Sequence, residues 1–432
     1  MAKPEENVCY AISNPRAALI WTTLAFFAGF GGVSAFGPIV PKLKQAMDVD
    51  PFLMGILAAS PALTGSLLRI PFGAMVDRMG GKKPILILLL LAAAGVAGIM
   101  LMFSLSPTPR ASDYPFFLIF GILCGCGIAV FSVGVPAVSY WYPQRKQGTA
   151  LAVYGGMGNL APGVFALLLP YLVVNIGFTW SYVLWLAALL AMTFLVFAGM
   201  KDAPYFQYKE MGMDIDPDAL LLACGEELVP TGKVMDSIRK AGADWRTWVL
   251  TYFYFITFGG FIALTVWFPT FWTGLFKIGM VQAGLFTAAF SLSASLLRVA
   301  GGIASDKLGG LLVAQFSFVM VAAGSLVLVF GGRSIAAAFA GQMLLALGMG
   351  VANAAVFKLV PKFTPKAVGG AAGIIGGLGA FGGFLLPPAL GLFVRMNGET
   401  GYANGFYMFL GLAVSALILF TVLKRSTASV LP

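Results

Sequence analysis

Apolar residues follow one another along this chain in long stretches that contain few charges. A helix needs about 20 mostly apolar residues to cross a lipid bilayer. We predict a membrane-spanning helix for each of twelve stretches: residues 17–40, 51–76, 84–105, 114–139, 148–172, 179–200, 247–272, 281–304, 310–331, 334–357, 368–394 and 403–423. Helices are expected because they satisfy their own backbone hydrogen bonds in lipid. The predicted fold class is therefore an all-α membrane protein with twelve transmembrane helices.

One long polar interval separates the sixth apolar stretch from the seventh. It divides the chain into an N-terminal six-helix half (1–200), a linker (201–246) and a C-terminal six-helix half (247–432). The linker contains DIDPDA (214–219), which begins like a calcium loop. The glycine and the bidentate acid of such a loop are missing, because Ala219 and Gly225 stand at those positions. We interpret the interval as a cytoplasmic linker with some helix.

The two halves carry related sequence segments. SLLRIPFGAMVDRMGG (66–81) matches SLLRVAGGIASDKLGG (295–310), and GTALAVYGGMG (148–158) aligns with GGAAGIIGGLG (369–379). The second and eighth predicted helices therefore correspond, as do the fifth and eleventh. Two pseudo-symmetric halves of six helices are typical of transporters, whose site lies near mid-membrane between the halves.

Composition and charge agree with a membrane protein. Hydrophobic residues make up 59% of the chain and charged residues only 10%, against about 25% in soluble domains. The 27 Lys and Arg residues exceed the 17 acids, but they are spread over short loops, so we predict no nucleic-acid partner. Placing both termini in the cytoplasm of a plasma-membrane protein puts 19 of them inside and 6 outside, as the positive-inside rule requires.

Metal and disulfide chemistry are not expected. The chain has four cysteines and no histidine. Cys124 and Cys126 resemble a metal pair, but no third ligand accompanies them. We interpret them as small apolar residues that pack on a membrane helix.

Two arginines, Arg69 and Arg298, interrupt apolar stretches at equivalent places of the repeat. All 17 acids lie in termini, loops or helix ends, so neither arginine has a carboxylate at its depth. A charge inside the membrane costs about 2.5–3.5 kcal/mol, and two cations ~8 Å apart repel by about 2 kcal/mol at an effective dielectric of ~20. We infer that a small anion supplies the missing counter-charge. The alternative is that Arg69, seven residues before Asp77, extends toward the membrane surface.

The sequence contains other polar, aromatic and glycine residues that are candidates for a site near the arginines. Asn159 ends the segment GGMGN and could either bind an anion or bond to a neighbouring helix. Tyr254, Phe258 and Phe261 share one helix face, where packing is the ordinary role of an aromatic stripe. Gly377, Gly379 and Gly382 satisfy GxGxxG, but no strand precedes them, so we do not predict a dinucleotide site.

These motifs resemble those of a known family. GAMVDRMGGKK and GIASDKLGG are similar to loops of the major facilitator superfamily. The arginines of GSLLRIPFG and SLLRVAGG, together with the glycine-rich segments GGMGN and GIIGGLGAFGG, resemble the nitrate/nitrite porter family within it. The resemblance covers nearly the whole chain.

The resemblance implies a major facilitator fold and a substrate site. The residues it assigns to that site are Arg69, Arg298, Tyr254, Phe258, Asn159, Gly155, Phe131, Phe27 and Gly376. Gly376 departs from the family, where a serine can stand at this position, so a backbone or water contact is expected there. We expect nitrate and nitrite as substrates, a monomer in the lipid bilayer, no cofactor and no enzyme activity.

The residues constrain the transport mechanism less than they constrain the fold and the substrate. The predicted spans contain no acid or histidine to carry a proton, which favours exchange of nitrate for nitrite over proton symport. Proton symport through Tyr254 or bound water is the alternative, as is exchange of another small organic anion. A structural or sensory membrane protein would need neither arginine.

Overall fold

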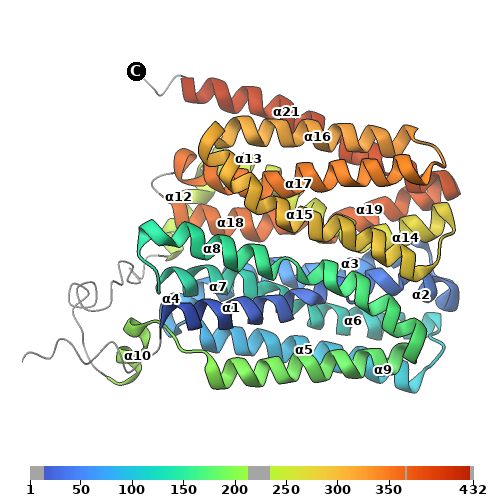
Figure 1. Ribbon diagram of the computed structural model, residues 1–432, viewed down its shortest axis with the longest axis horizontal. Coiled ribbons are helices and arrows are strands. Elements are labelled where there is room, and N and C mark those ends of the chain that lie inside the picture. Colours follow the sequence, from blue (N-terminus) through green and yellow to red (C-terminus); the bar gives the residue numbers. More distant parts are fainter. Residues whose placement is uncertain (1–13, 213–233, 365–366, 429–432) are drawn as a thin grey trace, which may run out of the picture.

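The computed structural model describes residues 14–212, 234–364 and 367–428, and every regular element in these ranges is a helix. The helices lie side by side, with most of them along the long axis of the molecule (Figure 1). The N-terminal half, blue to green, forms one bundle, and the C-terminal half, yellow to red, forms the other. The prediction of an all-helical fold is confirmed.

The longer helices of the first half are α1 (Pro15–Phe30), α2 (Val40–Met47), α3 (Pro51–Leu67), α4 (Arg69–Met79), α5 (Lys82–Leu105), α6 (Tyr114–Cys124), α7 (Val130–Ser139), α8 (Gln144–Gly158), α9 (Ala161–Gly199) and α10 (Pro204–Glu210). Those that follow are α12 (Val234–Ala243), α13 (Trp245–Tyr254), α14 (Gly260–Phe276), α15 (Met280–Leu308), α16 (Gly310–Phe330), α17 (Ile335–Phe363), α18 (Val368–Ala380), α19 (Gly382–Asn397), α20 (Gly401–Asn404) and α21 (Phe406–Ala428).

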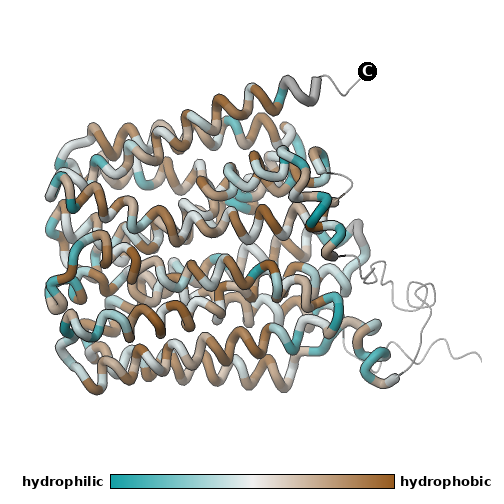
Figure 2. The backbone as a smooth tube through the Cα atoms, turned by 180° about the vertical axis from the view of Figure 1, so that it is seen from behind, coloured by the Kyte–Doolittle hydropathy of each residue, from teal (hydrophilic) through white to brown (hydrophobic). Residues whose placement is uncertain are grey.

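Eleven helical stretches of the described chain are long and apolar enough to cross a membrane. One of them, Lys146–Gly199, has 54 residues and contains both the fifth and the sixth predicted spans. It turns back at Gly177, whose φ of +78° is a conformation that glycine adopts without strain. This turn divides the stretch in two, so the twelve predicted spans are all present. Hydrophobic segments follow the length of the bundle and hydrophilic ones gather toward its ends (Figure 2).

At least six spans are interrupted along their length, the first of them by the 3-10 turns Gly31–Ser34 and Gly37–Ile39. The second breaks at Leu68, the fourth at the 3-10 turn Gly125–Ala129, the fifth at Asn159–Leu160, the seventh at the π-helical turn Phe255–Gly259 and the eleventh at Phe381. Interrupted helices in membrane proteins expose backbone groups only where protein or an internal cavity surrounds them. These breaks therefore mark the interior of the bundle as the place for a site.

The two halves approach closely at the end of the molecule that carries α2. A Cβ added to Gly37 would lie 2.8 Å from the backbone of Val266, and one on Gly55 would lie 2.7 Å from the Pro387 carbonyl oxygen. At the start of α18, near the other end, a Cβ on Gly369 or Gly373 would meet no atom within 4 Å. The contact between halves is therefore tight at the α2 end.

Parts of the predicted linker fold against the bundle. The backbone N–H of Gly370 in α18 donates to Ser237 Oγ in α12 over 3.0 Å. The segment DIDPDA (214–219) lies outside the described residues, as do Cys9 and Cys224. Among the described residues no group of three or more potential metal ligands occurs, and Cys124 and Cys126 are buried free thiols.

Asp202, just after α9, caps the start of α5 from a distant point of the chain. Its carboxylate accepts hydrogen bonds from the backbone N–H groups of Gly81 (2.6 Å) and Lys82 (2.9 Å). Burial raises the pKa of this carboxyl, and the two N–H donors oppose that rise only in part. The contact fixes the loop between the second and third spans to the end of the sixth.

We predict that Asp202→Ala lowers the thermal stability of the detergent-solubilised protein. The substitution leaves two N–H groups at the start of α5 without their acceptor, and loss of a cap costs about 1 kcal/mol. Asp202→Asn keeps a side-chain oxygen in the same place and serves as the matched control. Equal unfolding temperatures for Asp202→Ala and the wild type would contradict the capping role.

A second prediction concerns glycines of α8. A Cβ on Gly158 would lie 1.8 Å from Phe26 Cδ1, whereas one on Gly148 would meet nothing within 4 Å. We expect Gly158→Ala to destabilise the protein by about 1–3 kcal/mol, since the Phe26 ring must move. Gly148→Ala, on the same helix, should be neutral or stabilising. Thermal unfolding of both variants checks this, and a Gly158→Ala protein as stable as the Gly148→Ala one would show that the packing is loose.

Candidate functional site

The two predicted arginines come from opposite halves of the fold. Arg69 is the first residue of α4, directly after the break at Leu68, and only 2% of its surface is exposed. Its Nε donates to the Gly65 carbonyl and its Nη1 to the Gly376 carbonyl, both over 3.0 Å. The Arg69 side chain therefore reaches into the second half instead of extending toward the membrane surface.

Both guanidinium groups lie over the same two aromatic rings. The Arg69 Cζ atom is 5.0 Å from the ring centroids of Phe131 and of Phe258. The Arg298 Cζ atom is 5.6 Å and 5.8 Å from the same centroids. A cation within about 6 Å of an aromatic ring centroid is attracted by the ring. The two arginines thus share one interior region, with an aromatic residue from each half beside both.

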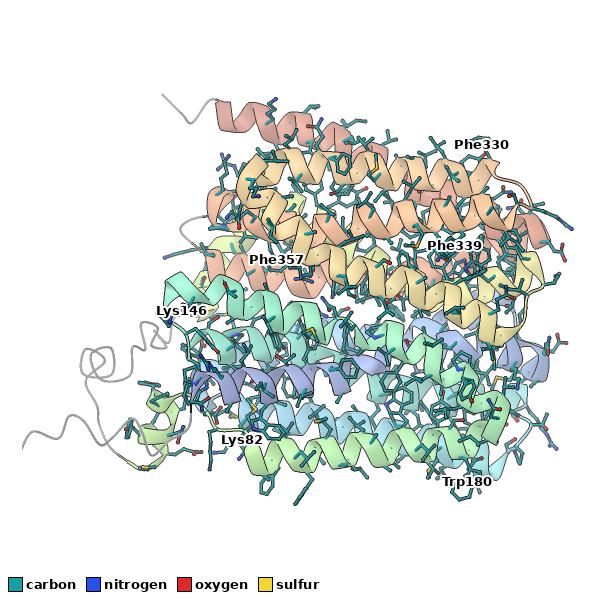
Figure 3. The ribbon with its side chains drawn as sticks, in the orientation of Figure 1. Lys82, Lys146, Trp180, Phe330, Phe339 and Phe357 are labelled. Carbon is teal, nitrogen blue, oxygen red and sulfur yellow. The ribbon has the colours of Figure 1, made fainter. Side chains whose placement is uncertain are left out.

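Further rings extend this aromatic cluster. Tyr254 stacks on Phe258 with centroids 4.9 Å apart and an angle of 9° between planes. Phe357 of α17, which is labelled in Figure 3, meets the Tyr254 ring edge-on at 4.8 Å. The π-helical turn Phe255–Gly259 carries Phe258, so the seventh span departs from regular α-helix where it contributes to the site.

The first span contributes Phe26 and Phe30, whereas the resemblance suggested Phe27. The Phe26 and Phe131 centroids are 5.2 Å apart, and those of Phe30 and Phe258 are 6.2 Å apart. Phe26 and Phe30 are separated by one helical turn and share a face of α1. Phe27 is rotated away from that face and is half-buried.

On the fifth span, Gly155 lies near Arg298, and Asn159 contacts the helix that carries Arg298. A Cβ on Gly155 would be 4.0 Å from Arg298 Nε and 3.9 Å from the Phe131 ring. Asn159 is 2% exposed, and its backbone carbonyl accepts a hydrogen bond from Ser295 Oγ over 2.8 Å. Gly155 thereby leaves room for the guanidinium, and Asn159 ties the fifth span to the helix that carries Arg298.

Several polar atoms in this region have no hydrogen-bond partner among the described residues. They are Arg69 Nη2, Arg298 Nη1, Tyr254 Oη and Asn159 Oδ1, all buried. A buried donor without a partner costs about 1–3 kcal/mol, more where it is charged. Three of the four groups are donors, so an acceptor-rich anion would satisfy them.

Protein carboxylates do not neutralise the arginines. The ion pairs found in the described chain are Lys83–Glu210, Lys277–Glu399, Arg333–Glu399, Lys358–Asp306 and Arg395–Asp50, all between partly exposed side chains. Neither Arg69 nor Arg298 belongs to one of them. The region therefore holds two cations without a carboxylate partner among the described residues.

Sequence reasoning missed some residues of this region. Phe26, Phe30 and Phe357 join the ring cluster, and the Tyr154 hydroxyl donates to the carbonyls of Val130 (2.9 Å) and Phe131 (3.0 Å). The spacing of Phe26 and Phe30 was the one available signal, because residues four apart share a helix face. Phe357 carried none, since α17 is apolar on most sides.

Comparisons with known proteins agree with this architecture. The family model of the Major Facilitator Superfamily matches residues 22–329. A partially occluded inward-open structure of the xylose transporter XylE from E. coli covers 94% of this chain and 98% of its own, with a TM-score of 0.66 and 16% identity. This likeness concerns the fold alone.

Two curated relatives cover almost the whole chain. The "Probable nitrate transporter NarT" of Staphylococcus epidermidis is 27% identical over 94% of this chain and 96% of its own. The "Probable nitrate/nitrite antiporter NarK1" of Thermus thermophilus is 29% identical over 95% and 92%. The chain therefore belongs to the major facilitator superfamily of membrane transporters, and within it to the nitrate/nitrite porter family.

Proposed function

We propose that this protein carries nitrate and nitrite across the plasma membrane, with the anion held between Arg69 and Arg298. The observation that carries the proposal is the pair of cations, Arg69 buried and Arg298 half-buried, over one pair of rings, with an unpaired buried N–H group on each. The curated relatives named as nitrate and nitrite transporters support the same substrate class.

The shape of the substrate suits the side chains. Nitrate and nitrite are small, flat and singly charged. A guanidinium group presents parallel N–H donors that match two oxygens along one edge of such an anion. Phe131 and Phe258 limit the space beside the arginines, which favours a flat ion over a tetrahedral one. The binding residues we propose are Arg69, Arg298, Tyr254, Phe258, Asn159, Gly155 and Phe131, with Gly376 acting through its carbonyl.

We further propose that transport is an exchange of one anion for another. Without an anion the two guanidinium groups repel each other in a region of low dielectric, which opposes rearrangement of the empty protein. An anion relieves the repulsion, and the halves can then rock as rigid bodies about the site. The excess of Lys and Arg at the α10 end favours a cytoplasmic position for that end and for both termini.

We predict that Arg69→Lys and Arg298→Lys each abolish nitrate-dependent thermal stabilisation and nitrate uptake. Lysine keeps the charge but lacks the planar fork. Removing a charged hydrogen bond costs about 1.5–3 kcal/mol, so affinity should fall at least tenfold. Arg333→Lys is the matched control, because Arg333 is exposed and pairs with Glu399. Uptake like that of the wild type by either site variant would refute the clamp.

The exchange mechanism is tested by counterflow in proteoliposomes. We expect uptake of labelled nitrate only when nitrate or nitrite is present inside the vesicles. Uptake into anion-free vesicles driven by an inward proton gradient would instead establish proton symport, for which the unpaired hydroxyl of Tyr254 offers a group. Formate, oxalate and phosphate inside the vesicles should not replace nitrate, and efficient exchange with any of them would change the substrate class.

A further inference from the structure

Tyr154 is a fully buried side chain of the fifth span that lies near the arginine site. It stands in α8, one residue before Gly155, and α8 lies alongside α7 of the fourth span (Figure 1). Its hydroxyl group donates to the carbonyl oxygens of Val130 (2.9 Å) and Phe131 (3.0 Å). The contact therefore joins the fifth span to the backbone of the residue whose ring lies beside both arginines.

The Tyr154 hydroxyl bonds to the fourth span directly after a break in that span. The 3-10 turn Gly125–Ala129 ends there, and Val130 and Phe131 are the first two residues of α7. A stretch of 3-10 helix inside a longer helix often marks a hinge. Hydrogen bonds to the first turn after this hinge fix the direction of α7, and with it the position of the Phe131 side chain.

Gly134 leaves the room that the Tyr154 hydroxyl occupies. A Cβ on Gly134 would lie 2.1 Å from Tyr154 Oη and 2.3 Å from Tyr154 Cζ. Atoms in a close-packed interior do not approach so closely, so a larger residue at position 134 would displace the phenol ring. One turn of α7 therefore forms a socket for the hydroxyl, made of two carbonyl oxygens and a glycine.

The ring of Tyr154 also packs against the ring of Phe131. Their centroids are 6.1 Å apart, with an angle of 16° between the planes. Phe26 contacts both rings, with its centroid 5.1 Å from that of Tyr154 and 5.2 Å from that of Phe131. Because rings packed in this way move only together, the position of Phe131 depends on Tyr154 through its backbone and through its side chain.

Two buried tyrosines near the arginines use their hydroxyl groups differently. Tyr254 Oη has no hydrogen-bond partner among the described residues, whereas Tyr154 Oη donates to two carbonyl oxygens. A tyrosine hydroxyl has one proton to donate, and the carbonyls of Val130 and Phe131 already share that of Tyr154. Tyr154 therefore has no donor left for an anion, and its effect on the site passes through Phe131.

We propose that Tyr154 is a positioning residue for anion selectivity, which holds the Phe131 ring at a fixed distance from Arg69 and Arg298. This inference rests on the function proposed above, in which an anion binds between these arginines. The Arg69 and Arg298 Cζ atoms lie 5.0 Å and 5.6 Å from the Phe131 centroid, so the ring limits the space beside them. A ring that is held in place excludes a tetrahedral ion, and a ring that is free to move admits one.

The test compares nitrate with perchlorate, which carries the same single charge but is tetrahedral. Each unlabelled anion competes with labelled nitrate for the full-length protein in detergent. We expect Tyr154→Phe, which keeps the ring and removes the hydroxyl, to lower the ratio of nitrate to perchlorate affinity about threefold. Tyr182→Phe is the matched control, because Tyr182 is equally buried and its hydroxyl donates to the Ala35 carbonyl. The control should lower the unfolding temperature and leave the affinity ratio unchanged.

Gly134→Ala provides a second variant, in which the added Cβ displaces the Tyr154 ring. The affinity ratio should fall here as well, whereas Gly148→Ala, whose Cβ meets nothing within 4 Å, should leave it unchanged. An unchanged ratio in Tyr154→Phe, or an equal fall in Tyr182→Phe, would overturn the positioning role. Failure of the wild type to bind labelled nitrate would overturn the proposed function itself, and the two failures are thereby distinguished.

Discussion

The repulsion between two interior guanidinium groups, Arg69 fully buried and Arg298 half-buried, is the constraint on which the interior of this transporter depends. Arg69 and Arg298 lie over the same two rings, and the described chain offers them no carboxylate. Each ring attracts a cation through its face, which offsets part of the cost of burial. In the function proposed above, an anion that enters removes the remaining cost, and its binding is thereby coupled through charge to the conformational equilibrium of the protein.

The breaks in the helices are related to the same two arginine charges. Arg69 starts α4 directly after a break and bonds through Nη1 to the Gly376 carbonyl, in the glycine-rich eleventh span. Phe258 sits in a π-helical turn, and Asn159 at the break between α8 and α9. A straight helix offers no free carbonyl at mid-depth. The breaks and the close approach allowed by glycine therefore place acceptors and rings around charges that an ordinary bundle would exclude.

Charged residues outside the arginine site form ion pairs with one another. The ion pairs of the described residues lie at the ends of the bundle between partly exposed side chains, where each contributes little to stability. The interior arginine pair differs, because neither Arg69 nor Arg298 has a carboxylate partner among the described residues.

The sequence by itself determined the apolar spans, their division into two related halves and the arginine pair, because hydropathy and missing counter-charges are properties of short segments. It also identified Tyr254, Phe258 and Gly155, which the structure brings beside the arginines or beside each other. Only the tertiary structure decided that Phe26 and Phe30 face the cluster, that Phe357 joins it and that the Gly376 carbonyl accepts from Arg69. The reason is geometric. One residue along a helix changes the direction of a side chain by about 100°, and a sequence does not show which backbone carbonyl accepts a hydrogen bond from a side chain.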